Sequence, residues 1–241
     1  MSDSPITKAN LEQYLKEVAK EFRRRSGKGM PAEIILIGGA SVIINYGFRE
    51  LTYDMDAIIN ASSAMEDAIR FIGDKYELPN GWMNDDFVKT GSYTPKIEQY
   101  AKYYRTFSNV VTVRTVTGEH LIAMKLMSGR KYKYDRSDII GILAEQEKAG
   151  KPLSFENVKS AVCDLYGSYE VLSEEIRQFI EKVFEEGNYT ELYERTRQYE
   201  AENKENLLEY QEKKPGVVTG DNVNDIIEAL RKRKAERQGK V

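Results

Sequence analysis

Cysteine and histidine are almost absent from this chain of 241 residues, which contains one of each, Cys163 and His120. One cysteine cannot form a disulfide within the chain, and this is typical of a protein from a reducing compartment. A structural zinc site needs four cysteine or histidine ligands, so that kind of site is excluded. A serine–histidine–aspartate triad would depend on His120, and no nucleophile-elbow pattern accompanies it. Acid, base and metal chemistry therefore falls to carboxylates, lysines and arginines, as in metal-assisted phosphoryl or nucleotidyl transfer.

Long apolar runs are also missing. No stretch is apolar over the length needed to cross a bilayer, so we expect no contact with membranes. The first seven residues show no basic region followed by an apolar one, so we expect no signal peptide and a cytoplasmic location. The net charge of −3 lacks the basic excess of a dedicated nucleic-acid-binding protein. The 41% of hydrophobic and 31% of charged residues are those of an ordinary globular protein.

The spacing of apolar residues predicts alternating helices and strands over the first 150 residues. Leu11, Leu15, Val18 and Phe22 form one apolar stripe of a helix, which Thr7 or Asn10 is suited to cap. The next elements that we predict are a strand at 34–37, a buried helix at 40–46, a strand at 52–60, a helix opened by a capping box at 63–66, a strand at 110–116, and helices at 117–129 and 137–148.

After residue 150 the pattern becomes entirely helical, with Ser154 and Ser173 as predicted caps. We therefore expect an α/β (α+β) fold in two regions. Residues 1–150 form a domain with a small mixed sheet flanked by helices, and residues 151–241 form a helical C-terminal region. Tyrosines, lysines and arginines gather at 93–107, where they either contact a base or RNA, or line a domain interface.

Two carboxylates carry the chemistry that we expect. Asp54 and Asp56 lie two apart on the predicted strand, so both side chains point to the same face, while Tyr53, Met55 and Ala57 pack on the other. Two ionised carboxylates on one face repel each other unless a cation lies between them. Mg²⁺ is commonly held by one or two carboxylates, with substrate phosphates and water completing its shell. Asp54 and Asp56 are therefore the predicted Mg²⁺ ligands.

A glycine pair adds a place for phosphate. Gly38 and Gly39 stand between a predicted strand and the start of a helix, where backbone N–H groups and the positive end of the helix dipole attract an anion. Ser41 either caps that helix or donates its hydroxyl to a phosphate oxygen.

These motifs together resemble the signature of the nucleotidyltransferase superfamily. They are Ile37-Gly-Gly-Ala-Ser41, then Tyr46-Gly-Phe-Arg49, then Thr52-Tyr-Asp-Met-Asp56. The residues and spacing of these motifs are most similar to a bacterial branch near the AbiEii-type toxins of abortive-infection systems. The resemblance implies Mg²⁺-dependent transfer of a nucleotidyl group from an NTP to an acceptor hydroxyl. It also implies that Gly38, Gly39, Ser41 and Arg49 bind the nucleotide.

The same branch carries a second block, a helix with Lys-Leu followed by a basic residue and paired aspartates. Lys125-Leu126, Arg130, Asp135 and Asp138 resemble it. By resemblance, Lys125 contacts the triphosphate, and Asp135 or Asp138 supports the site. From the residues alone, Lys125 fits a solvated helix face and Asp135 a helix cap.

One departure from the superfamily is visible. Many active members carry a third carboxylate on a later central strand, but the matching segment, 110–116, has none. Either the branch does without it, or Asp135 or Asp138 substitutes, or the protein binds nucleotide without catalysing transfer.

The acceptor stays open between RNA, which the toxin resemblance suggests, a protein side chain and a small molecule. An antitoxin-like protein is the partner that a toxin–antitoxin role implies.

Overall fold

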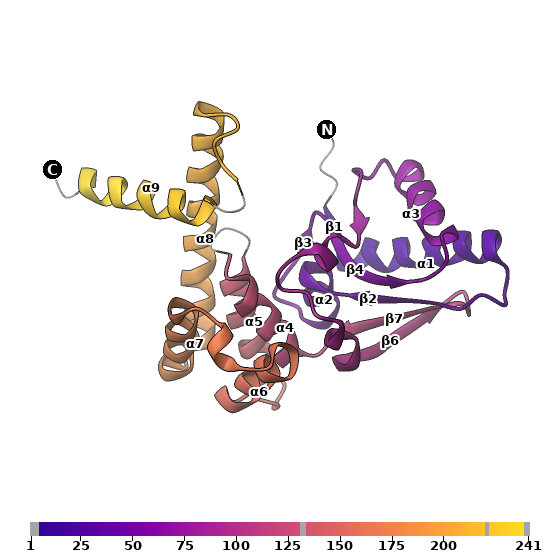
Figure 1. Cartoon of the computed structure of the whole chain (residues 1–241), viewed down its shortest axis with the longest axis horizontal. Coiled ribbons are helices and arrows are strands. Elements are labelled where there is room, and N and C mark those ends of the chain that lie inside the picture. The colour runs from indigo at the N-terminus through magenta and orange to yellow at the C-terminus, as the bar shows by residue number, and fades with distance from the viewer. Residues whose placement is uncertain (1–4, 131–133, 220–221, 239–241) are drawn as a thin grey trace.

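A five-stranded mixed sheet forms the N-terminal part of the computed structural model, which describes residues 5–130, 134–219 and 222–238. The strands lie side by side in the order β5 (Met83–Asn84), β4 (Met55–Asn60), β2 (Ala32–Leu36), β7 (Val111–Val116) and β6 (Ala101–Phe107). Strand β2 is antiparallel to β4 and parallel to β7. The predicted fold class, a small mixed sheet flanked by helices and followed by a helical region, is confirmed (Figure 1).

One face of the sheet is covered by α1 (Lys8–Ser26) and α3 (Ala64–Lys75), which pack against each other. The predicted stripe of α1 is buried there, together with Met55 and Ala57 of β4. Thr7 caps α1 by accepting from the Asn10 backbone N–H, and Asn10 returns a bond to the Thr7 N–H, so both predicted caps act together.

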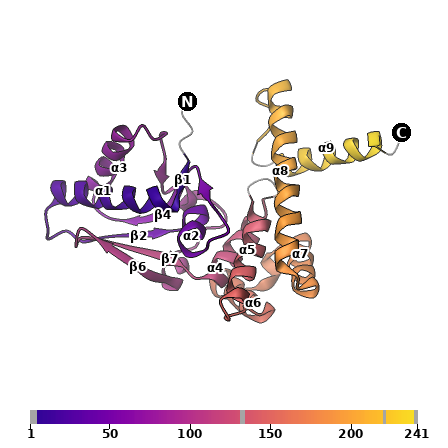
Figure 2. The same ribbon diagram turned by 180° about the vertical axis from the view of Figure 1, so that it is seen from behind.

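The opposite face of the sheet meets the helical part of the chain. Ile35 and Ile58 from this face belong to the same core as α4 (Gly118–Ser128), α5 (Asp135–Lys148) and α6 (Phe155–Tyr166). Figures 1 and 2 show the two parts side by side along the long axis, with α4 and α5 at the junction. Side chains at positions 54, 56 and 58 point towards this junction, because 55 and 57 point to the other face.

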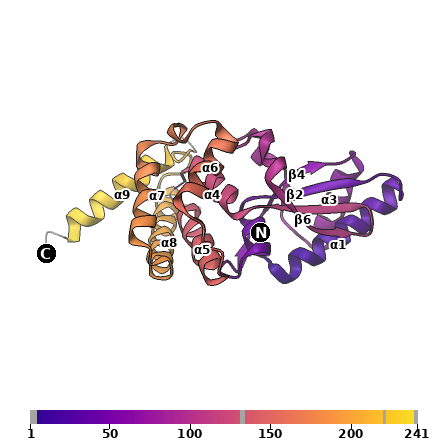
Figure 3. The same ribbon diagram turned by 90° about the horizontal axis from the view of Figure 1, so that it is seen from below.

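The remaining helices complete the C-terminal part. They are α7 (Glu174–Glu186), α8 (Tyr189–Lys213) and α9 (Val223–Gln238). Helix α8 packs along α5, and α9 begins against α8 and then extends away from it (Figure 3). Ser154 and Ser173 cap α6 and α7, as predicted. Among the described residues, every helix is too short or too polar to span a bilayer.

Short elements complete the N-terminal part. Helix α2 (Gly38–Asn45) follows β2, and the two-residue strand β3 (Leu51–Thr52) pairs with β1 (Ile6–Thr7). The predicted strand at 52–60 is therefore two strands, β3 and β4, with Tyr53 and Asp54 between them. The segment 83–100 holds β5 and two short 3₁₀ helices, Asp86–Lys89 and Pro95–Tyr100. This segment and β6 were not predicted.

Candidate functional site

The junction of β2 and α2 presents the two glycines that the sequence singled out. Gly38 has φ of +54°, in the left-handed region that favours glycine. A Cβ atom there would lie 3.0 Å from Oδ2 of Asp56, and one on Gly39 would lie 2.7 Å from Oγ1 of Thr52. The absence of side chains thus lets β4 and its carboxylate lie against the first turn of α2. This turn is the positive end of the helix dipole.

Asp54 and Asp56 share one cleft, although β4 begins one residue after Asp54. The alternation that we predicted holds for Met55 and Ala57, which are buried on the far face. It is wrong for Tyr53, whose side chain is 49% exposed. Tyr53 lies in the bend between the two strands, where the pleat that would have turned it into the core is interrupted.

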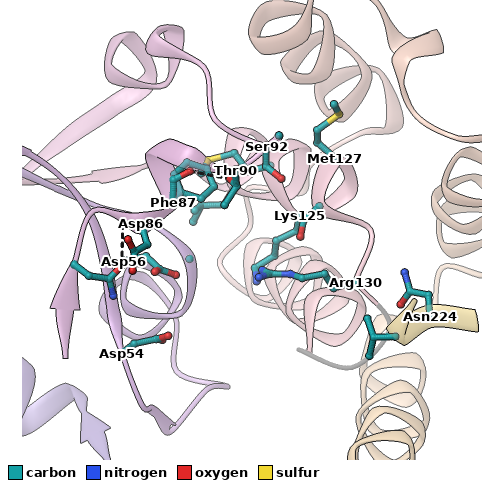
Figure 4. Close-up of a pocket in the computed structure, with 17 residues that line it drawn as sticks. Asp54, Asp56, Asp86, Phe87, Thr90, Ser92, Lys125, Met127, Arg130 and Asn224 are labelled. Carbon is teal, nitrogen blue, oxygen red and sulfur yellow. Dashed lines mark hydrogen bonds between the residues drawn. The ribbon is translucent and has the colours of Figure 1, made fainter. Parts of the chain in front are cut away.

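The cleft has a volume of about 800 Å³ and lies between the sheet and α4. Gly38, Asp54, Asp56 and Asp86 line it on the sheet side, and Lys125 and Arg130 line it on the helical side (Figure 4). Phe87, Thr90 and Ser92 close one end. One wall is thus acidic and the wall opposite is basic.

Lys125 is buried, so the solvated helix face suggested by the residues alone is wrong. Its Nζ lies 2.7 Å from Asp138 and 3.1 Å from Asp135, both in the first turn of α5. Arg130 extends the network by donating to Asp135, with its Nε at 2.9 Å. Neither aspartate lines the cleft, because Lys125 lies between them and the opening.

The network fixes the charges of its members. Burial lowers the pKa of Lys125, but attraction by Asp138 and Asp135 outweighs it, and the pKa of the ammonium is raised. For Asp135, burial raises the pKa, but Lys125 and Arg130 more than offset this, and the pKa is lowered. The lysine is therefore favoured as a cation on the cleft wall.

Two residues of the predicted nucleotide site have protein partners in this structure. Arg49 forms an ion pair with Asp138 and donates through Nε to the Leu51 carbonyl at 3.2 Å. Ser41 is fully buried, and its Oγ accepts from Asn45 Nδ2 at 3.3 Å. Helix α2 is capped at Ile37, so Ser41 does not cap it. Neither Arg49 nor Ser41 lines the cleft that contains Asp54 and Asp56.

A third carboxylate enters the cleft from an unpredicted position. Strand β7 has no acid, and its Arg114 points to Glu33 and to carbonyls at residues 98 and 101. Asp86, which the sequence analysis did not single out, lines the cleft beyond β5 (Figure 4). The only signal for Asp86 in the sequence was its position after a turn. Strand β5, which precedes it, has two residues and is too short to show an alternating pattern. Within the described residues, no three acidic, histidine or cysteine side chains are close enough to form a metal cage on their own.

The comparisons with known proteins point to one family. No curated protein and no solved structure matches the chain. A family profile described as "Nucleotidyltransferase of unknown function (DUF6036)" matches residues 13–197. That range runs from α1 into α8 and includes Gly38, Asp54, Asp56 and Lys125. Because the match covers most of the chain, this protein belongs to that nucleotidyltransferase family.

Proposed function

We propose that the protein is a Mg²⁺-dependent nucleotidyltransferase that binds an NTP in the cleft between β4 and α4. The observation that carries the proposal is the pairing of Asp54 and Asp56 with the first turn of α2 on one wall, opposite Lys125 and Arg130. A triphosphate carries several negative charges along its length, and it suits a cleft with cations on one side and metal ligands on the other.

The residues present fit a magnesium ion that arrives with its nucleotide. Mg²⁺ is seldom held by an all-protein cage and usually takes one or two carboxylates plus phosphate oxygens and water. Asp54 and Asp56 supply two carboxylates, and no third group within the described ranges completes a cage. When bound, the ion would neutralise phosphate charge and lower the barrier to attack at phosphorus.

The chain's own groups would do the rest. The N–H groups at Gly38 and Gly39 hold phosphate oxygens at the helix end. Lys125, kept charged by its two aspartates, stabilises the negative charge that develops on the phosphates. The acceptor hydroxyl oxygen forms a bond to the α-phosphorus. The bond from that phosphorus to the bridging oxygen breaks, pyrophosphate leaves with the electron pair, and the hydroxyl proton passes to solvent.

The first experiment measures NTP binding by calorimetry with and without Mg²⁺. We expect Asp54→Asn combined with Asp56→Asn to abolish the Mg²⁺-dependent part of binding. Asp74→Asn, an exposed carboxylate on α3 outside the cleft, is the matched control and should bind like the wild type. Unchanged Mg²⁺–NTP binding in the double variant would show that the metal site lies elsewhere.

The second experiment adds labelled NTP to cell RNA, protein and small molecules and follows transfer. Binding without transfer onto any acceptor would favour a module that binds nucleotide without catalysing transfer, which the absence of a carboxylate on β7 suggested.

The AbiEii-type branch and an antitoxin-like partner stay predictions. A small regulator gene beside this one would support them.

A further inference from the structure

A second cleft lies on the other side of Asp54. It has a volume of about 790 Å³, and it runs between the segment 48–54 and α8. Asp54 lines both clefts, so a molecule in the second one lies next to the carboxylate that serves the first. An acceptor hydroxyl must approach the metal site from a place that the NTP does not occupy. The second cleft provides such a place.

The lining of this cleft combines aromatic rings with cations. The Arg197 guanidinium lies 3.6 Å from the centre of the Tyr134 ring. Lys204 Nζ lies 5.7 Å from the Tyr53 ring centre and 5.8 Å from that of Tyr134. Over the described part of the chain, neither Arg197 nor Lys204 has a carboxylate partner within ion-pair distance. Their charges are held in place by tyrosine rings and remain available to an anion.

Tyr53 gives the cleft an open stacking surface. It is among the most exposed large hydrophobic residues in the described part of the chain, and it is adjacent in sequence to Asp54. Phe48 and Tyr193 line the same cleft, and the Tyr193 hydroxyl donates to the Phe48 carbonyl at 3.2 Å, which ties α8 to this segment. An exposed tyrosine that the pleat would otherwise have buried is thus presented to a ligand.

We propose that this cleft binds the end of a single-stranded nucleic acid, whose terminal hydroxyl is the acceptor. The inference rests on the proposed nucleotidyltransferase function and names its acceptor. Arg197 and Lys204 would contact phosphates, and Tyr53 would stack on a base, because single strands are bound by cationic grooves with aromatic platforms. A peptide offers no repeated phosphates to these two cations. The tyrosines, lysines and arginines at 93–107, where we expected contact with a base or RNA, or a domain interface, line neither of these two clefts.

The test measures binding of fluorescent single-stranded RNA and DNA of about 12 nucleotides, without NTP, over a range of salt. We expect Arg197→Ala with Lys204→Ala to weaken binding about tenfold or more. The slope of log affinity against log salt should fall by about 1.4, since each phosphate contact contributes about 0.7 for single strands. Tyr53→Ala should also weaken binding about tenfold but leave the slope unchanged.

The matched control is Arg195→Ala with Lys213→Ala. Both residues are exposed cations on α8 that do not line the cleft. This variant removes the same charge from the same helix and should bind like the wild type. Equal weakening by the control, or no weakening by the cleft variants, would overturn the proposal. A preference for RNA or for DNA would support it and identify the strand.

These outcomes separate the acceptor site from the proposed reaction. Cleft-dependent binding of oligonucleotides without Mg²⁺–NTP binding would support the second cleft and remove the transfer function. Mg²⁺–NTP binding with transfer onto protein, and no binding of oligonucleotides, would keep the transfer function and overturn the acceptor site.

Discussion

At the scale of single residues, the charges between α4 and α5 decide what the cleft presents to a ligand. Lys125 can be buried on α4 because Asp135 and Asp138 both lie within 3.1 Å of its ammonium group. Arg49 reaches the same cluster from the segment before β3. The resemblance pointed to these residues, but which of them pair depends on α4, α5 and the sheet meeting in space.

A second buried group, Glu200, is expected to make stability depend on pH. It lies on α8 and accepts from the backbone N–H groups of Arg136 and Ser137, at 2.9 and 3.3 Å, at the start of α5. Burial raises the pKa of its carboxyl from 4.5 to about 7. Between these two values the folded protein holds a proton that the unfolded chain has lost. We therefore expect the free energy of unfolding to fall as pH rises from 4.5 to 7, by up to about 3 kcal/mol, and then to level off.

Urea unfolding at pH 5, 6, 7 and 8 measures this effect. Glu200→Gln keeps a side-chain oxygen to accept both N–H groups and removes the titration. Relative to the variant, the wild type should lose stability steadily up to pH 7. Glu202→Gln, an exposed carboxylate two residues further along α8, should follow the wild type. Parallel curves for wild type and Glu200→Gln would contradict the assignment.

At the scale of elements, a helix with clear signals at both ends was predicted almost to the residue. Helix α4 lies between Thr117 and Gly129, as predicted from those two residues. Strands with little alternation of apolar and polar residues were not predicted. Strand β5 has two residues, and β6 alternates poorly because it lies at the sheet edge with most of its side chains exposed. Asp86 follows β5 and lines the cleft. Because β5 was not predicted, Asp86 was not predicted as a cleft residue either.

Two serines in capping patterns differ in whether they cap a helix in the structure. Ser154 accepts from the Asn157 backbone N–H at 3.1 Å, whereas Ser63, in the pattern Ser63-Ala-Met-Glu66, already has helical backbone angles and makes no capping bond. We expect Ser154→Ala to lower the free energy of unfolding by about 1 kcal/mol. Ser63→Ala, the matched control, should change it by less than about 0.5 kcal/mol. Equal losses in chemical denaturation would mean that Ser63 caps α3 after all.

At the scale of the whole molecule, the core is continuous across residue 150, where we placed the boundary between the two regions. Helices α4 and α5 precede that point, and they pack on α6 and α8, which follow it. Ile122 and Ile139 share one core with Val162 and Ile180. The cleft with Asp54 and Lys125 lies at this junction, so its geometry depends on both regions being present.

This continuity predicts how fragments behave. A fragment of residues 1–150 keeps the sheet but exposes the apolar sides of α4 and α5 that α6 and α8 cover, and hydrophobic burial is the main source of folding free energy. We expect calorimetry to show one cooperative transition for the full chain and none, or a broad one, for the fragment, with strong binding of a hydrophobic dye. A fragment of residues 1–219 is the control, because it loses only α9 and the contacts of Val223 and Ile227 with Leu207, and it should keep the single transition. A sharp transition in the 1–150 fragment would instead show that the sheet region folds alone, and that the helical region only docks onto it.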